Sequence, residues 1–492
     1  MISLDKDLVS IQEVRNLIGQ AKEAQEKLAL MSQEQIDKIC IAIVNAAERE
    51  SEKLAKMAQE ETGFGIWQDK VIKNNFASST VWNYAKDMKT VGVINEDKLN
   101  QVTEVAVPMG VIAGLIPSTN PTSTVIYKAL ISIKAGNSIV FSPHPNALKS
   151  ILETVRIISE AAESAGCPRG AILSMTTPTL QGTDQLMKHP DTALILATGG
   201  SAMVKAAYSS GTPAIGVGPG NGPAFIEKSA DISNAVRQIM ESKTFDNGTI
   251  CASEQSIVVE DSARDKVVRE LESQGAYFLP EEDAKKLEKF IMRPNGSMNP
   301  QIVGKSVSTI AKLANIKVPS NARVLIANET RVGKNIPYSR EKLAPILAFY
   351  SRASWQEARD LCTDILNNEG AGHTMTIHSK DEDIIRDFSL KIPVSRLLVN
   401  TPGTLGGIGA TTNIAPALTL GCGAVGGSST SDNISPLNLM NIRRVTYGVR
   451  ELSDLRNTQK SSIDDGNSFD FQTILTNEMV DSLVSRILER LQ

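Results

Sequence analysis

The stretch "VTEVAVPMGVIAGLIPSTNPTST" (residues 102–124) decides the fold class of this chain. Its first part predicts a strand, a turn at Pro108 and Gly110, and a buried apolar strand that ends at Ile116. A polar crest (117–124) follows and leads into a helix over "VIYKALISIKAG", which a glycine ends. A buried strand followed by a helix is half of a βαβ unit, so the stretch predicts a parallel sheet.

The same alternation continues along the rest of the chain. Short apolar strands are expected at "NSIVFSPHP", near 171–175 and at "TALILATGG", with helices over 147–165 and 180–188 between them. A second series starts near residue 230 and contains the strands "SEQSIVVE" and "RVLIANE". Before both series, residues 8–60 have apolar positions at helical spacing and predict two or more amphipathic helices. The pattern therefore predicts an α/β fold with parallel sheets.

The composition is that of an ordinary globular protein and argues against several classes of function. Of the 492 residues, 41% are hydrophobic, 22% are charged and 4% are aromatic, and the net charge is -4. A slightly acidic chain with few aromatic residues is not expected to bind nucleic acid or an anionic membrane. The first residues lack the pattern of a signal peptide, and no apolar run reaches the ~20 residues that a membrane helix needs. We therefore expect a cytosolic protein.

The five cysteines contain no C-x-x-C spacing, which argues against a zinc site or a disulfide framework and favours a reducing compartment. The four histidines lack metal-ligand spacing as well, so we expect no metal. Cys40 and Cys362 fall in helical patterns and are expected to be packing residues. Cys251 differs because "FDNGTICASEQ" places it at a polar turn before a strand, without Lys, Arg or His within five residues. It is either a packing residue or a nucleophile that backbone dipoles or distant residues activate.

Two polar segments follow predicted strands, at the edge where open α/β sheets bind ligands. Within 117–124, Asn120 offers an amide N–H to a developing oxyanion. The alternative is that a Ser or Thr of the segment caps the next helix, and the two are compatible. In "ATGGSAMVKAA", Gly199 and Gly200 stand at a helix N-terminus that can receive a phosphate. Without a full G-x-G-x-x-G, this is weak evidence for dinucleotide binding. The glycine-rich segment 400–435 is expected to be loop-like, either flexible or in close contact with a ligand or neighbouring chain.

Taken together, these motifs resemble the aldehyde dehydrogenase superfamily, and specifically its CoA-acylating branch. The resemblance implies two parallel-sheet α/β domains, one for the cofactor and one for catalysis, and a small oligomerisation region. The implied boundaries are 1–228 for the dinucleotide-binding domain, with an oligomerisation strand near 95–107, then 229–430 for the catalytic domain, and 431–452 for a return segment and second oligomerisation strand. The matching stretches are "PMGVIAGLIPSTNPTST", "IVFSPHPNA", "LATGGSAMVKAAYSSGTPAIGVGPGNGPAF", "TFDNGTICASEQ", "EKLAPILAFY", "GAGHTMTIHS" and "NTPGTLGGIGA…LGCGAVGG".

The resemblance also implies roles for individual residues. Cys251 would attack the aldehyde carbonyl, and Asn120 with the Cys251 backbone N–H would form the oxyanion hole. His373 matches a histidine of the acylating branch that assists CoA or a proton transfer, although a hydrogen-bonded loop histidine is the alternative. Glu341 matches the glutamate that holds the nicotinamide ribose. The other residues expected to contact NAD are Ile116, Pro117, Ser118, Ser142, His144, Gly199, Gly200, Ser201, Gly218 and Pro345.

One motif of the superfamily is missing from this sequence. Hydrolytic members carry a glutamate that orients the deacylating water, but the equivalent run here, "IGVGPGNGPAF" (215–225), contains no acid. The position of that glutamate falls at or near Val217, and the next acid is Glu227. A thioester on Cys251 would therefore survive until the thiol of CoA takes the acyl group, because a thiol needs less help from a base than water does.

The sequence thus predicts a reversible, NAD-dependent conversion of acetaldehyde, or another short aldehyde, and CoA to acyl-CoA. NADP stays open because the run from Phe141 to His144 lacks the acid that rejects a 2′-phosphate. The alternatives are an acylating enzyme for propionaldehyde, butyraldehyde or sulfoacetaldehyde, a hydrolytic dehydrogenase, and a non-catalytic scaffold protein.

The end of the chain has a different texture. Residues 453–474 read as a polar linker, and 475–492 as an amphipathic helix that needs a partner surface. Similar tails dock enzymes to bacterial microcompartment shells or to one another, and the alternative is packing on the protein's own oligomer. By family analogy we expect a homodimer or homotetramer, built through the strands near 100–107 and 438–448, in the cytoplasm or inside a microcompartment.

Overall fold

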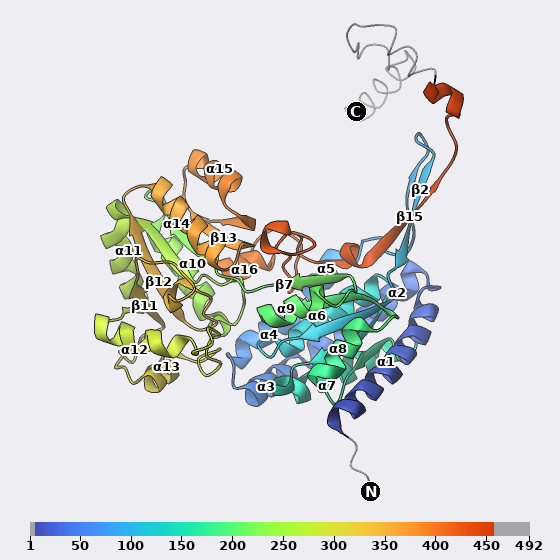
Figure 1. Cartoon of the computed structure of the whole chain (residues 1–492), viewed down its shortest axis with the longest axis horizontal. Coiled ribbons are helices and arrows are strands. Elements are labelled where there is room, and N and C mark those ends of the chain that lie inside the picture. Colours follow the sequence, from blue (N-terminus) through green and yellow to red (C-terminus); the bar gives the residue numbers. More distant parts are fainter. Residues whose placement is uncertain (1–4, 457–492) are drawn as a thin grey trace. The chain divides into compact units, whose positions relative to one another are not determined.

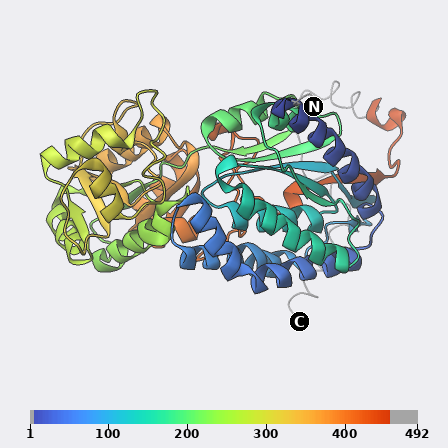
Figure 2. The same ribbon diagram turned by 90° about the horizontal axis from the view of Figure 1, so that it is seen from below.

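A computed structural model describes residues 5–456 of the chain (Figure 1). The chain divides into two compact units, one made of residues 1–95 and 104–443, the other of residues 96–103 and those from 444 on. The larger unit contains two parallel sheets, each with helices on both faces (Figure 2). The predicted α/β class with parallel sheets is confirmed, whereas the predicted domain boundaries stay a prediction.

The first parallel sheet has five strands in the order β5-β4-β3-β6-β7. Its central strand β3 is buried on both faces, as expected of a parallel sheet covered by helices. Ile112 and Ile116 pack toward α2, α6 and α7, while Ala113 and Leu115 pack toward α1, α8 and α9. The strands are β3 (Val111–Ile116), β4 (Ser138–Pro143), β5 (Ile172–Ser174), β6 (Thr192–Thr198) and β7 (Ala214–Val217), and the covering helices are α1 (Lys6–Leu28), α2 (Gln33–Arg49), α6 (Pro121–Lys134), α7 (Leu148–Ser164), α8 (Leu180–Lys188) and α9 (Ser201–Tyr208).

The second parallel sheet has seven strands in the order β10-β11-β12-β9-β8-β13-β14. Its two faces are covered by α10 and α11 on one side and by α12 to α15 on the other. The strands are β8 (Pro223–Ile226), β9 (Ser256–Glu260), β10 (Ala276–Phe278), β11 (Val324–Asn328), β12 (Ile346–Arg352), β13 (Gly372–His378) and β14 (Val394–Val399), and the helices are α10 (Ile232–Thr244), α11 (Asp261–Ser273), α12 (Glu281–Ile291), α13 (Val307–Ala314), α14 (Trp355–Asn368) and α15 (Glu382–Lys391).

The stretch 102–124 forms the predicted strand, turn, buried strand and helix start. The backbone N–H groups of Met109 and Gly110, in the turn, donate to the side chain of Asn137 at 2.7 and 3.0 Å. Strand β2 (Val102–Pro108) lies between β1 (Gly92–Asp97) and β15 (Met440–Thr446) in a separate three-stranded sheet. Between α2 and β1 the chain forms α3 (Ser51–Thr62), α4 (Trp67–Asn75), a π-helical turn (Phe76–Thr80) and α5 (Val81–Ala85).

The glycine-rich segment 400–435 is mostly irregular, with one short helix, α16 (Gly403–Gly407). Its glycines let the backbone approach other parts of this chain closely: a Cβ on Gly407 would lie only 2.8 Å from the Cβ of Ala252. The segment therefore packs against the turn that carries Cys251.

Two predictions concern the end of the chain and membranes. The predicted linker 453–474, from residue 457 on, and the predicted helix 475–492 lie outside the described residues. Among the described residues, none of the helices combines the length and apolar character that crossing a membrane requires.

Candidate active site

Cys251 lies in the connection between α10 and β9, directly after a short turn (Phe245–Gly248). Its side chain is half-buried and packs at the border of the apolar core. Asp246 and Asn247 in that turn have φ values of 48° and 53°, a left-handed conformation that costs non-glycine residues of order 1 kcal/mol each. Such a turn persists only where its surroundings hold it in place.

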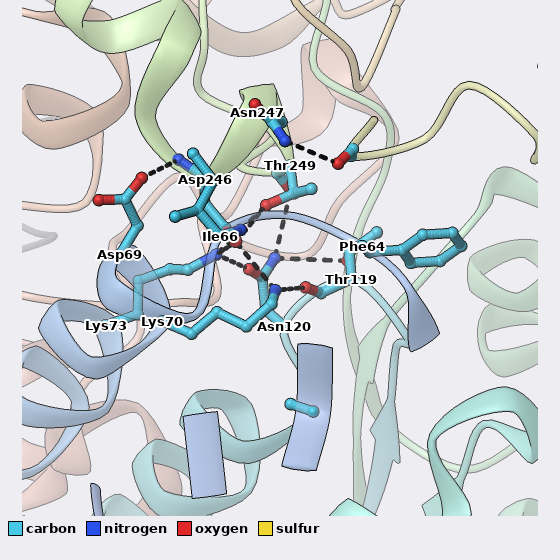
Figure 3. Close-up of polar contacts among 12 residues, drawn as sticks. Phe64, Ile66, Asp69, Lys70, Lys73, Thr119, Asn120, Asp246, Asn247 and Thr249 are labelled. Carbon is cyan, nitrogen blue, oxygen red and sulfur yellow. Dashed lines mark hydrogen bonds and ion pairs between the residues drawn. The ribbon is translucent and has the colours of Figure 1, made fainter. Parts of the chain in front are cut away.

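Asp246 is the residue that anchors this turn (Figure 3). Its buried carboxylate accepts hydrogen bonds from the ammonium groups of Lys70, at 2.9 Å, and Lys73, both on α4. The backbone N–H of Ile66 at 2.6 Å and the hydroxyl of Thr249 at 2.7 Å also donate to it. Burial alone would raise the pKa of Asp246, but the two ammonium groups outweigh burial and the pKa is lowered.

Asn120 is the first residue before α6, yet its side chain makes no capping hydrogen bond. Its amide nitrogen donates instead to the carbonyl of Thr249 at 3.2 Å and to the hydroxyl of Thr119 at 3.3 Å, and its amide oxygen accepts from Lys73. The structure thus brings Asn120 to the turn of Cys251 and does not support the capping alternative.

Gly220, from the acid-free run 215–225, lies on the other side of Cys251. A Cβ at Gly220 would clash with the backbone carbonyl oxygen of Cys251 and would come within 3.2 Å of the His373 ring. The N–H of Gly220 donates to the Glu341 carboxylate at 2.8 Å. Cys251, His373 and Glu341, predicted as site residues from distant segments, therefore surround one glycine.

His373 is a buried strand residue and not a loop residue, because it belongs to β13. Its Nδ1 lies 3.0 Å from the Thr374 hydroxyl, whereas its buried Nε2 has no hydrogen-bond partner in the described structure. Burial, with the nearby Arg396, lowers the pKa of His373 to about 3, so the ring is neutral at physiological pH.

The environment of Cys251 keeps its thiol protonated. Burial is the largest cause, Glu341 and Cys422 add to it, and together they raise the pKa of Cys251 to about 12. Arg396 and the backbone act in the opposite direction, and these are the distant residue and backbone dipoles that the sequence predicted as the only sources of activation. Glu341 itself has a pKa raised to about 8, by burial and by the charge of Glu369.

Sequence reasoning missed Lys70, Lys73, Arg396 and Cys422. The two lysines are 176 and 173 residues from their partner Asp246, and their sequence looks like a solvated helix surface. The one available signal was their i, i+3 spacing, which places both on one helix face. Arg396 is buried and donates to the carbonyls of His373 at 2.9 Å and Gly421 at 2.7 Å, so it joins β13 to the glycine-rich segment.

Apart from Glu341 and Pro345, the predicted cofactor residues gather at the carboxyl edge of the five-stranded sheet. Parallel pairing aligns the carboxyl ends of β3, β4, β6 and β7, with Ile116 opposite Pro143 and Thr198 opposite Val217. This alignment brings the following residues to one edge: Ile116, Pro117, Ser118, Ser142, His144, Gly199, Gly200, Ser201 and Gly218. Pro345 lies elsewhere, directly before β12 of the seven-stranded sheet, where its carbonyl accepts the N–H of Leu325 at 2.9 Å.

This edge fits the diphosphate of a dinucleotide. Helix α9 begins at Ser201 after Gly200, and no side chain caps its N-terminus. A Cβ at Gly200 or Gly218 would have no neighbouring atom within 4 Å, so there is open space beside both glycines. An uncapped helix N-terminus with open space beside it favours a bound anion. Among the described residues, no group of three or more His, Cys, Asp or Glu side chains could hold a metal ion.

Comparison with known proteins gives the family. The model of the aldehyde dehydrogenase family matches residues 7–412. The bifunctional aldehyde-alcohol dehydrogenase AdhE of Escherichia coli (strain K12) is 44% identical over 443 residues, which are 89% of this chain and 50% of that protein. This chain thus spans about half the length of the aldehyde-alcohol dehydrogenases that it matches.

Two solved structures resemble the chain over most of its length. A probable aldehyde dehydrogenase from Listeria monocytogenes EGD-e has a TM-score of 0.91 and 74% identity, covering 92% of this chain and 100% of its own. An acetylating aldehyde dehydrogenase from Geobacillus thermoglucosidasius has a TM-score of 0.90 and 55% identity, covering 91% and 99%. Because the family match extends over most of the sequence and both structures agree with it, the chain belongs to the aldehyde dehydrogenase family.

Proposed function

We propose that this chain is a CoA-acylating aldehyde dehydrogenase. It converts acetaldehyde or another short aldehyde, CoA and NAD reversibly into acyl-CoA and NADH, through a thioester on Cys251. The names of two similar proteins, an aldehyde-alcohol dehydrogenase and an acetylating aldehyde dehydrogenase, support the reaction class.

The observation that carries the proposal is the contact between Gly220 and Cys251. Since a Cβ at Gly220 would clash with the carbonyl oxygen of Cys251, the acid-free run 215–225 passes directly against the backbone of Cys251 without a side chain at the contact. A carboxylate that could orient water from this run is absent from the sequence. The acyl group would therefore persist on sulfur until a second thiol attacks it.

The residues of the chain would act in the following order. The Cys251 thiol first loses its proton to solvent, and its sulfur then forms a bond to the carbonyl carbon. The carbonyl oxygen becomes an alkoxide that the Asn120 amide N–H stabilises. Both present hydrogen bonds of that amide are long, at 3.2 and 3.3 Å, so one N–H can turn toward the substrate oxygen. NAD, when bound, would supply the hydride acceptor, and the alkoxide would collapse to a thioester as the hydride leaves the carbon. The thiol sulfur of CoA then attacks the thioester carbon, and the Cys251 sulfur leaves as a thiolate that takes up the proton lost by the CoA thiol.

His373 is the residue proposed to assist the CoA thiol. Its neutral ring has an Nε2 without a partner in the described structure, which can accept a hydrogen bond from an approaching thiol. Because the pKa of His373 is low, we propose hydrogen bonding to the thiol rather than storage of a proton on the ring.

Hydrolysis to a free acid is the second candidate function, and one observation favours it. The Glu341 carboxylate is close enough to Cys251 to raise the pKa of its thiol, and a pKa of about 8 suits a general base for water. One of its oxygens is already engaged by the N–H of Gly220, however, which restricts the carboxylate.

The deciding experiment measures NADH formation from acetaldehyde while CoA is varied, and identifies the product. We expect acetyl-CoA and a rate that depends on CoA. Acetate formed at the same rate without CoA would support hydrolysis instead. Mass spectrometry after addition of aldehyde and NAD without CoA should find the acyl group on Cys251, and acylation at another residue would contradict the proposal.

NAD is the proposed cofactor, and the same assay tests it against NADP. The end of β4 carries Ser142 and the exposed His144, neither of which is an acid that would reject a 2′-phosphate. If kcat/KM for NADP equalled that for NAD, the proposed preference for NAD would be wrong. A panel of acetaldehyde, propionaldehyde, butyraldehyde and sulfoacetaldehyde with CoA would define the substrate.

Oligomerisation and docking belong to the proposal as well. Strand β15 is an end strand of its sheet, and its Ile442 and Val445, on opposite faces, are 40% and 43% exposed. An end strand with exposed apolar side chains favours pairing with a second copy. Light scattering is expected to show a dimer or tetramer. Docking of residues 475–492 to a microcompartment shell rests on the sequence alone, and a fluorescent protein fused to 457–492 tests it by co-localisation with shells.

A further inference from the structure

Lys73 is a buried cation that contacts both the candidate oxyanion residue and the turn of the nucleophile. Its ammonium is 2% exposed. It donates to the amide oxygen of Asn120, to the carboxylate of Asp246 and, at 3.2 Å, to the hydroxyl of Thr249 (Figure 3). An ammonium has three N–H donors, so this set of partners uses all of them and leaves none unsatisfied.

The contact with Lys73 determines which way the Asn120 amide points. An ammonium donates hydrogen bonds and accepts none, so only the amide oxygen can face Lys73. On the opposite side, the carbonyl of Thr249 accepts and does not donate, so only the amide nitrogen can face it. If the amide were flipped, its nitrogen would face the ammonium of Lys73, donor against donor, and its oxygen would face the carbonyl of Thr249, acceptor against acceptor. In a buried site each of these mismatches is costly.

The charge of Lys73 also changes the strength of Asn120 as a donor. A cation next to the amide oxygen draws electron density away from the nitrogen, which strengthens hydrogen bonds from its N–H groups in a site of low dielectric. The benefit is largest when an alkoxide accepts such a bond, because charge then develops at the acceptor.

We propose that Lys73 is a positioning residue of the oxyanion hole, which fixes and polarises the Asn120 amide for the alkoxide formed on Cys251. This inference rests on the proposed function in one respect: an aldehyde must be oxidised through such an alkoxide. It does not depend on whether CoA or water receives the acyl group.

Lys70 offers a matched control on the same helix. Its ammonium is equally buried, at 3% exposed, and binds the same carboxylate of Asp246 at 2.9 Å. Its other partner is the backbone carbonyl of Thr119 at 3.1 Å, and not the side chain of Asn120. A substitution of Lys70 therefore removes a cation from the Asp246 cluster without removing the contact to the amide.

The experiment compares Lys73→Met with Lys70→Met in the full-length protein. We expect Lys73→Met to lower kcat for NADH formation about 10²-fold, close to the loss from removing an oxyanion donor, with KM for aldehyde changed less than about threefold. Lys70→Met is expected to lower kcat less than about tenfold, at a comparable loss of stability. Lys73→Gln keeps a donor toward Asn120 without the charge, and should recover part of the activity.

A double-mutant cycle with Asn120→Ala tests whether Lys73 acts through Asn120. If it does, the protein with both substitutions is no more than about threefold slower than Asn120→Ala alone. Alkylation of Cys251 by iodoacetamide needs no oxyanion hole, so its rate should be nearly unchanged in Lys73→Met.

Three results would overturn the inference: equal losses of kcat in the two lysine variants, independent losses in the double mutant, or a Lys73→Met protein as active as the wild type. Failure of the proposed function is a separate result, seen in the wild type as turnover without CoA. In that case the same comparison of variants is made in the hydrolytic assay, and a wild type that oxidises no aldehyde at all removes both proposals.

Discussion

The two parts of the candidate site are held in place by different physical means. The turn before Cys251 depends on buried charges, since Asp246 is bound by Lys70 and Lys73 from a distant helix. The edge around Gly199 and Gly200 depends on the register of parallel strands, and the side chains that support it bind backbone groups instead of a counter-charge: Lys128 donates to the carbonyls of Leu115 and Leu196 at 2.8 Å, and the Tyr208 hydroxyl binds Gly216.

The difference follows from what each part has to do. The turn adopts a left-handed backbone that is unfavourable by itself, and the carboxylate of Asp246 also accepts the backbone N–H of Ile66. The edge has only to present free N–H groups to an anion, and any side chain would take up that space. Substitutions at the turn should therefore affect stability and kcat, whereas substitutions at the edge should affect cofactor affinity.

The largest effect is expected from Cys251→Ala, which removes the nucleophile. Aldehyde oxidation should fall at least about 10⁴-fold, because no covalent intermediate can form. Binding of NADH, measured by fluorescence titration, should stay within about threefold of the wild type, since the edge is built from other segments. An active Cys251→Ala protein would mean that the turn is structural and that chemistry occurs elsewhere.

Asp246→Asn should have the next largest effect, and it separates charge from backbone strain. Asn tolerates the left-handed φ of 48° as well as Asp does, so the substitution removes the charge and keeps the backbone. Two buried ammonium groups then lack their counter-charge, and the free energy of unfolding should fall by about 3–5 kcal/mol in urea titrations.

A surface pair provides the control for that prediction. Lys285 and Glu281 form an exposed salt bridge at 2.5 Å on α12, and Lys285→Met should leave the urea unfolding curve nearly unchanged. If Asp246→Asn and Lys285→Met lowered stability by comparable amounts, burial would not make the ion pairs of Asp246 more important for stability than a surface ion pair.

Two glycine substitutions compare the parts directly. Gly220→Ala introduces a clash with the carbonyl of Cys251 and should cost about 1–3 kcal/mol of stability, with a large fall in kcat. Gly200→Ala meets open space, so stability and kcat should be preserved while KM for NAD rises a few-fold. The measurements are urea unfolding and steady-state kinetics. If Gly220→Ala and Gly200→Ala lowered kcat equally, the turn of Cys251 and the edge of the five-stranded sheet would not differ in their roles.

The sequence predicted the edge better than the turn, for a physical reason. Strand ends, glycines and helix starts are local features, so the pattern from Ile116 to Gly200 located the edge once a parallel sheet was assumed. Segments over 180–188 and 171–175 were also predicted closely, because apolar periodicity sets them.

The partners of Cys251 could not be found in this way. Lys73 and Arg396 lie far away in sequence, and a lysine in a polar helix normally reads as solvated surface. Whether such a lysine is buried depends on a carboxylate 173 residues away, which only the folded chain brings next to it. The strand-end pattern supplied Asn120 and the resemblance supplied Glu341, but neither gave an account of what orients Asn120.

The smallest effect, and the most specific, concerns the charge of Glu341 and its dependence on pH. A thiol with a pKa near 12 is almost entirely protonated at about pH 8, so alkylation of Cys251 should keep rising with pH without a plateau there. Glu341 has a pKa of about 8, so its negative charge opposes thiolate formation only above that pH. Glu341→Gln should therefore speed alkylation about three- to tenfold at about pH 9 and leave it unchanged at about pH 6.5. If the wild type and Glu341→Gln were alkylated at equal rates at the higher pH, the charge of Glu341 would be too far from the thiol to act. If Glu341→Gln were alkylated faster at both pH values, the substitution would have changed access to the thiol and not its pKa.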